Sequence, residues 1–135
     1  MSRGREVALE FGQGCIAPVH IAIAVLEVPD ELTDAVLRPL GLEPARLVAT
    51  LREAAPMGTY EVGVTGGPDL VYSEPGVRIL YGGNGEAAAM GHRVVHPLHV
   101  LLAVLRDPTA RAGRLLRRAG TDPALVEAAF RAEVP

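Results

Sequence analysis

The hydrophobic pattern is dominated by two short runs that are apolar on nearly every side, HIAIAVLE at 20–27 and HVLLAVLR at 99–106. A proline stands just before each run, at Pro18 and Pro97. Proline is favoured in the first turn of a helix because its missing N–H is not needed there. A helix that is apolar all round lies inside a protein, whereas an amphipathic helix lies on its surface. The pattern therefore predicts two buried helices that begin near these prolines.

Amphipathic segments follow each apolar run at the same distance. LEPARLVATLRE at 42–53 and TDPALVEAAFRAE at 121–133 both open with an acidic residue and a proline, and apolar residues then recur at helical spacing. Gly41 and Gly120 directly precede them, in the position of the left-handed residue that ends a helix. These elements predict an all-α fold. A stretch at 55–72 is rich in glycine and proline, and we expect it to be a linker.

The chain repeats itself. When the sequence is displaced by 79 positions, residues 8–52 align with 87–131 without a gap, and 15 of the 45 aligned pairs are identical. Of the other 30 pairs, 12 are apolar in both copies. A repeat at a fixed distance indicates an internal duplication, here within a single domain that covers 1–135. We place repeat 1 at 5–54 and repeat 2 at 73–133.

The repeated motif resembles that of a known family. The string GHRVVHPLHVLLAVLRDP at 91–108, followed by LLRRAGTD at 115–122, is matched once more in the first half. This combination is similar to the Clp N-terminal domain, which precedes the ATPase modules of Clp-type AAA+ unfoldases. The resemblance covers nearly the whole chain, and repeat 2 is the closer match. It implies a compact bundle of two pseudo-twofold-related helical repeats, which serves as a docking platform for substrates, adaptors or small molecules.

The chain departs from the family at positions that bind phosphorylated arginine in some members. The resemblance implies a glutamate directly before the histidine of each repeat and a threonine at the start of each opening helix. Here Val19 and Leu98 replace the glutamates, Ser73 matches the second threonine, and the first would fall before Met1. A neutral side chain cannot pair a guanidinium, which would forfeit a charge-assisted hydrogen bond worth about 1.5–3 kcal/mol. We therefore do not expect recognition of phosphoarginine.

The opening helices of the two repeats also depart from the family. Repeat 1 retains only residues 5–11 of its opening helix. In repeat 2 the string GGNG at 82–85 predicts a break or kink, because each glycine costs a helix about 1 kcal/mol relative to alanine, and Ser73 or Glu74 would cap the first piece. Two interpretations stay open: drift, including a start codon assigned too late, or a groove that binds a ligand. The residues expected to line such a groove are Ser73, Val77, Leu80, Tyr81, Val19 and Leu98.

Three histidines within eight positions raise the question of a metal site. His99 and its repeat partner His20 match the structural histidine of the family, so we expect each ring to bond backbone or to cap a neighbouring helix. His92 belongs to the family's Gly-His pair, and His96 is extra. Their spacing would suit zinc on one helical face, but Pro97 places a helix start between them. We expect no metal, and structural roles for His20, His99, Pro18, Pro97, Gly41 and Gly120.

Composition narrows the classes of partner. The chain of 135 residues is 49% hydrophobic but only 4% aromatic, which suits a helical core of small and branched aliphatic residues. Its net charge of −3 predicts no affinity for nucleic acid or an anionic membrane, and no apolar run is long enough to span one. The single Cys15 fits a reducing compartment and the start does not resemble a signal peptide, so we expect a soluble, cytoplasmic protein. A local basic cluster is expected to be a solvated helix face rather than a phosphate site: Arg111, Arg114, Arg117 and Arg118.

No motif of a known enzyme class stands out. The P-loop pattern GxxxxGK[ST] is absent, and YGGNGEAAAMG at 81–91 lacks the lysine and the preceding strand of a phosphate cradle. Cys15 stands five residues before His20, but no third residue is in place to orient them, so we expect a buried structural thiol. We predict no ATPase activity, no catalytic residue and no cofactor.

Three hypotheses about function follow. The first is a stand-alone binding module that docks a Clp unfoldase, its adaptor or its substrate, or that acts as a decoy for ligands of the unfoldase. The second is a scaffold repurposed to bind or transform a small molecule in a biosynthetic pathway. Its polar candidates are Tyr81, Glu86, His92 and His96. The third is a relic or fragment of a longer unfoldase. Separately from these hypotheses, an apolar surface left by the missing helix would suit a homodimer.

Overall fold

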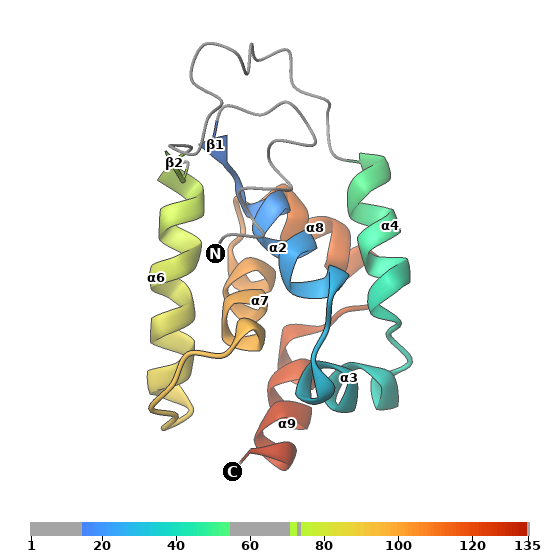
Figure 1. Cartoon of the computed structure of the whole chain (residues 1–135), viewed down its shortest axis with the longest axis vertical. Helices are drawn as coiled ribbons and strands as arrows, with labels where there is room; N and C mark the ends of the chain where they lie inside the picture. Colours follow the sequence, from blue (N-terminus) through green and yellow to red (C-terminus); the bar gives the residue numbers. More distant parts are fainter. Residues whose placement is uncertain (1–14, 55–70, 73, 135) are drawn as a thin grey trace.

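Two apolar helices, α2 (Pro18–Glu27) and α7 (Pro97–Arg106), lie against each other in the middle of the molecule (Figure 1). The structure is a computed structural model that describes residues 15–54, 71–72 and 74–134. The other elements are β1 (Cys15–Ile16), α3 (Glu31–Leu37), the 3-10 helix η1 (Arg38–Leu40), α4 (Pro44–Ala54), β2 (Val71–Tyr72), α6 (Glu74–Ala89), α8 (Arg111–Arg118) and α9 (Pro123–Glu133). The two short strands pair in parallel. The predicted all-α fold is confirmed.

Both central helices begin in the same way. A proline occupies the first turn of each, and the third helical residue is a histidine. The backbone N–H of Ala17 donates to Nδ1 of His20 at 2.8 Å, and the N–H of His96 donates to Nδ1 of His99 at 2.7 Å. Each imidazole thus accepts a hydrogen bond from a backbone N–H group at the start of a buried helix. An unpaired N–H group would be energetically costly there.

The elements of the two halves keep the spacing of the sequence repeat. α2 and α7 begin at Pro18 and Pro97, and α4 and α9 begin at Pro44 and Pro123, in both cases 79 positions apart. Helix α3 packs on α9 and α8 packs on α4, which is the reciprocal arrangement that a pseudo-twofold axis would produce. The duplication itself stays a prediction, whose direct test is the superposition of the two halves.

Glycines end the helical segments that precede α4 and α9. Gly41 has a φ of 78° and Gly120 a φ of 99°, in the left-handed region that a side chain disfavours. Their backbone N–H groups donate to the carbonyl oxygens of Arg38 at 2.9 Å and Arg117 at 3.0 Å. The chain can therefore turn sharply at these two points and begin the next helix.

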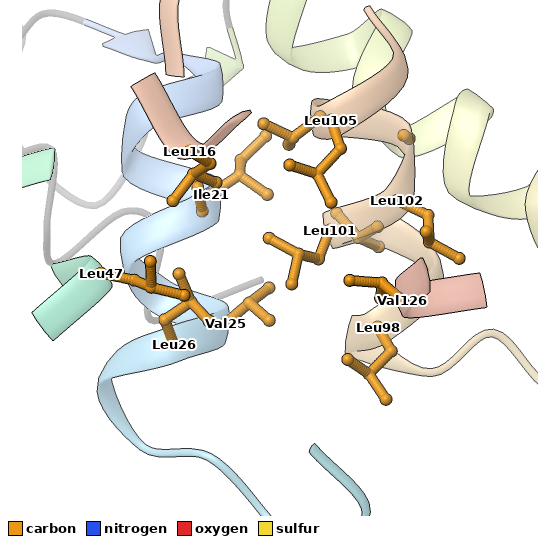
Figure 2. Close-up of a cluster of buried hydrophobic side chains, with 14 of the residues drawn as sticks. Ile21, Val25, Leu26, Leu47, Leu98, Leu101, Leu102, Leu105, Leu116 and Val126 are labelled. Atoms are coloured by element: carbon orange, nitrogen blue, oxygen red, sulfur yellow. The ribbon is translucent and has the colours of Figure 1, made fainter. Parts of the chain in front are cut away.

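The core between α2 and α7 is aliphatic. Ile21 and Val25 of α2 and Leu101 and Leu105 of α7 lie in the space between the two helices (Figure 2). Burial of each such side chain contributes about 1.5–3 kcal/mol. The covering helices add further apolar side chains to the same cluster, among them Leu47 of α4, Leu116 of α8 and Val126 of α9.

The prediction of a break in the opening helix of repeat 2 is wrong. Helix α6 runs without interruption from Glu74 to Ala89, through all of the glycines. A methyl group at Gly82 would lie 3.0 Å from Cβ of Ala103, and one at Gly83 would lie 3.0 Å from Cγ2 of Val100. The two glycines therefore let α6 approach α7 closely, and the resulting packing offsets their low helix propensity.

Several sequence predictions lie outside the described residues. They are the opening segment 5–11, most of the linker at 55–72, the groove residue Ser73 and the capping role of Glu74. The side chain of Cys15 also lies outside them. In the described part of the chain, no helix combines the length and the hydropathy that crossing a membrane requires.

We expect Gly83→Leu to lower the free energy of unfolding by about 1–3 kcal/mol, because the new side chain would be forced against Val100 of α7. Gly85 has no atom within 4 Å of the position that its Cβ would take. Gly85→Leu should therefore raise the free energy of unfolding by about 0.5–1 kcal/mol through helix propensity alone. Urea denaturation followed by circular dichroism measures both, and equal effects would contradict this account of α6.

Candidate functional site

A pocket of about 450 Å³ opens where the loop 91–96 meets the start of α7. Helix α3 and the C-terminal end of α9 form its other sides. We call it the histidine pocket, because all three histidines of the 91–99 segment line it. Its lining residues are Leu32, Gly91, His92, Arg93, Val94, Val95, His96, Pro97, His99, Phe130 and Val134.

His92, His96 and His99 form one hydrogen-bonded chain with a single direction. Because Nδ1 of His99 accepts from the backbone N–H of His96, the proton of the neutral His99 ring is on Nε2. That Nε2 lies 2.9 Å from Nδ1 of His92, which therefore accepts. His92 then carries its proton on Nε2 and donates to the carbonyl oxygen of Val134 at 2.8 Å. This assignment follows from the hydrogen-bond network, and it requires both rings to be neutral.

The side chain of His96 links the starts of two helices. Its Nδ1 accepts from the backbone N–H of Leu98 at 3.0 Å, so its Nε2 donates to Oδ2 of Asp30 at 2.7 Å. The other carboxylate oxygen of Asp30 accepts from the N–H of Thr33 at 2.8 Å and caps α3. Burial raises the pKa of Asp30, but the hydrogen bonds from Thr33 and His96 outweigh it, so the pKa lies below its ordinary value.

The walls of the pocket are apolar in spite of its histidines. The rings of His92, His96 and His99 surround Phe130, with centroid distances of 5.3, 5.9 and 4.7 Å. Every ring nitrogen of the three histidines already has a hydrogen-bond partner. The described residues contain no group of three His, Cys, Asp or Glu side chains arranged to hold a metal ion. Apart from the exposed Arg93, the pocket presents ring faces and aliphatic side chains, which suit an apolar group.

Burial holds the histidine of each central helix in the neutral form. His20 and His99 are only 2% and 1% exposed. The pKa of each is lowered from 6.5 to about 4, mainly through desolvation by this burial, and for His99 the neighbouring His92 and His96 contribute to the lowering. Both rings are therefore uncharged at neutral pH, which is the state that their hydrogen bonds to the backbone require.

The sequence matches the family described as the Clp repeat (R) N-terminal domain over residues 1–119, which is most of the chain. The chain belongs to this family. Among curated proteins, none matches the sequence significantly.

Solved structures share the fold of this Clp N-terminal domain at low sequence identity. The N-terminal domain of the caseinolytic protease associated chaperone ClpD from Arabidopsis thaliana is 16% identical, with a TM-score of 0.69 over 98% of this chain and 90% of that one. The Hsp104 N-terminal domain from Candida albicans is 15% identical, with a TM-score of 0.73 over 96% and 82%. A structure titled as preliminary structural investigations of a malarial protein secretion system is 14% identical, with a TM-score of 0.79 over 98% and 87%.

The residues predicted to line a groove in this Clp N-terminal domain lie in different environments. Val77 and Tyr81 lie on α6 and are 39% and 71% exposed, whereas Leu98 is fully buried in the core. Leu80 and Val19 are partly buried against that core. None of these five lines the histidine pocket. Leu98 cannot touch a ligand while the core is closed, and a groove formed by the others stays a prediction.

The four polar candidates for a small-molecule site are not brought together. His92 and His96 line the histidine pocket, but Glu86 lines a separate pocket of about 280 Å³ between α6 and α7. There its Oε2 lies 3.4 Å from a guanidinium nitrogen of Arg106, and burial raises its pKa. Tyr81 lines neither of these two pockets. No observation on these residues favours a shared catalytic centre.

Several residues of the histidine pocket were missed by the sequence reasoning. Leu32, Phe130 and Val134 come from α3 and from the end of α9, far from the histidines along the chain. Val94 and Val95 did carry a signal, because they are two adjacent apolar residues just before the predicted helix start at Pro97. They are 77% and 41% exposed.

We expect the free energy of unfolding to fall as the pH is lowered from 7.5 to 5. The folded-state pKa of His20 and His99 is about 4, below the ordinary 6.5, so in this range the unfolded chain binds protons that the folded chain does not. The stability contributed by these neutral rings is fully present above about pH 6.5 and should fall by about 1–2 kcal/mol per histidine at pH 5. Urea titrations at the two pH values measure the loss.

His20→Gln provides the control for this pH dependence. It removes one of the two buried rings and should roughly halve the loss between pH 7.5 and 5, whatever it does to the stability at pH 7.5. Equal stability of the unsubstituted chain at both pH values would contradict the neutral burial of these histidines.

Proposed function

We propose that this chain is a protein-interaction module that binds an apolar side chain of a partner protein in the histidine pocket. The observation that carries the proposal is that each ring nitrogen of His92, His96 and His99 already has a partner within the chain. An apolar group can fill the pocket without disturbing these bonds, whereas a polar group would find no free ring nitrogen on the three histidines. The Clp N-terminal domain fold supports the proposal, because this fold suggests a module for protein interaction.

The rim of the histidine pocket offers apolar area for such a contact. Val94 is 77% and Val95 41% exposed, and Leu32 and Pro97 line the pocket beside them. Neighbouring apolar side chains that face solvent mark interaction surfaces more often than isolated ones do. Covering them with a partner would contribute roughly 25 cal/mol for each Å² removed from water.

The partner would be a Clp unfoldase, one of its adaptors or one of its substrates. A module of this kind can deliver a bound protein to the unfoldase, or it can compete with the unfoldase's own N-terminal domain for the same protein. Delivery would speed the degradation of an unfolded substrate by the Clp protease of the source organism, and competition would slow it. Degradation assays with and without the added chain distinguish the two roles.

We expect Val94→Asp to weaken the binding of an unfolded protein by at least about tenfold, because it places a carboxylate on the apolar rim of the pocket. Isothermal titration calorimetry with reduced, carboxymethylated α-lactalbumin measures the affinity. The matched control is Val28→Asp, since Val28 is 75% exposed but follows α2 and does not line the pocket. An equal loss in the control, or no binding by the unsubstituted chain, would contradict the proposal.

A further inference from the structure

Helix α8 concentrates positive charge that no carboxylate of the described residues neutralises. Four of its eight residues are arginines, and none is acidic. Within the described residues, the arginines of α8 and Arg93 have no ion pair, whereas six other arginines each lie 2.5–3.6 Å from a carboxylate oxygen. These six are Arg38, Arg46, Arg52, Arg78, Arg106 and Arg131.

One side of α8 is fixed firmly to the end of α7. A methyl group added to Gly113 would overlap the carbonyl oxygen of Val104, so the two backbones approach as closely as a glycine permits. Leu116 is fully buried on the same side. The guanidinium of Arg117 donates to the carbonyl oxygen of Leu105, near the C-terminus of α7. Arg117 therefore has a structural contact that accounts for its presence.

The other three arginines form an exposed stripe. Arg111, Arg114 and Arg118 follow one another at helical spacing, and all three are exposed. We call them the arginine face. Arg114 makes one contact with the chain, a hydrogen bond of 3.2 Å to the carbonyl oxygen of Pro108. Since α8 is held in place by its opposite side, the backbone positions that carry the arginine face are fixed and the side chains face solvent.

The arginine face is electrostatically unfavourable in the isolated chain. Arg111 and Arg114 lie near the N-terminus of α8, where the helix dipole is positive and where acidic residues are favoured. The first turn has no acidic residue, and Ala110 gives the helix no side-chain cap. Arg114 is also spaced three and four residues from Arg111 and Arg118, and like charges at these spacings repel. The stability of the free chain therefore does not explain Arg111 and Arg114.

Helix α3, the counterpart of α8 in the other half, has the opposite arrangement. Asp30 caps α3, and Glu31 and Asp34 lie in its first turn, where acidic side chains complement the dipole. The same place in the fold thus carries a favourable charge pattern in one half and an unfavourable one in the other. The unfavourable pattern is the one that an external partner would relieve.

We propose that the arginine face docks a carboxylate-rich segment of a partner protein. Arginine pairs carboxylates through two parallel hydrogen bonds, and three arginines spread over about 10 Å of helix match several carboxylates of one segment. Helix α8 packs on the C-terminal end of α7 (Figure 1), whereas the histidine pocket opens at the start of α7, so the inference does not depend on that site.

The same observations disfavour two other occupants. A nucleic acid gains most of its affinity from many phosphate contacts along its backbone, and a stripe of three arginines contacts few phosphates. The acidic cluster that a second copy would bring is the start of α3. There Asp30 is already engaged with His96 and Asp34 lies 3.3 Å from Arg38.

Binding of fluorescein-labelled hexaglutamate, followed by fluorescence anisotropy at about 20 mM salt, tests the proposal. Arg111→Gln/Arg114→Gln should weaken this binding by at least about tenfold. The matched control, Arg38→Gln/Arg46→Gln, removes the same charge from exposed arginines of the other half and should change the affinity by less than about threefold. The double substitution on α8 should also raise the melting temperature by about 1–3 °C, because it removes the repulsion in the free chain.

Each of four other outcomes would overturn the proposal. Equal weakening by the control would mean a general attraction to the whole chain, and absence of hexaglutamate binding at low salt would mean that the face binds no carboxylates. Tighter binding of labelled hexathymidylate than of hexaglutamate would assign the face to nucleic acid. Self-association at low salt that Arg111→Gln/Arg114→Gln abolishes, measured by analytical ultracentrifugation, would assign it to a second copy.

Discussion

The contact between α2 and α7 is the interaction on which the rest of the structure depends. Both helices bury nearly every side chain, so each must be surrounded by other elements of the fold. Helix α6 covers α7, α4 packs on α2, and α8 and α9 close further sides of the pair (Figure 1). The surfaces left for function are the ends of the central helices and the outer faces of the covering ones. The histidine pocket opens at the start of α7, whereas α8, which carries the arginine face, packs on the C-terminal end of α7.

His99 shows how a residue that begins a helix also shapes a site. One nitrogen of its ring accepts the N–H of His96 ahead of α7, and the other donates to His92 on the pocket wall. Both bonds need a neutral ring, and burial supplies that state. The pocket is apolar because its polar atoms are turned toward one another, so a cluster that looks like a metal site in the sequence behaves as a hydrophobic wall.

Local signals explain which parts of the fold the sequence could predict. The helix starts at Pro18 and Pro97 and the glycine turns follow from backbone geometry within a few residues. The continuity of α6 could not be predicted, because the glycines at 82–85 weaken a helix locally and their packing against α7 appears only in three dimensions. Only part of the histidine pocket could be predicted. Its histidines are neighbours in sequence, but Asp30, which holds the ring of His96, lies 66 positions from it along the chain.

Asp30 has a consequence for how the molecule comes apart. Its two carboxylate oxygens hold the first turn of α3 in one half and, through the ring of His96, the first turn of α7 in the other. Unfolding of the first turn of one helix would therefore remove a hydrogen bond that holds the first turn of the other. Because this one side chain bonds at both helix starts, we expect the two halves to lose their structure together, as a single cooperative unit.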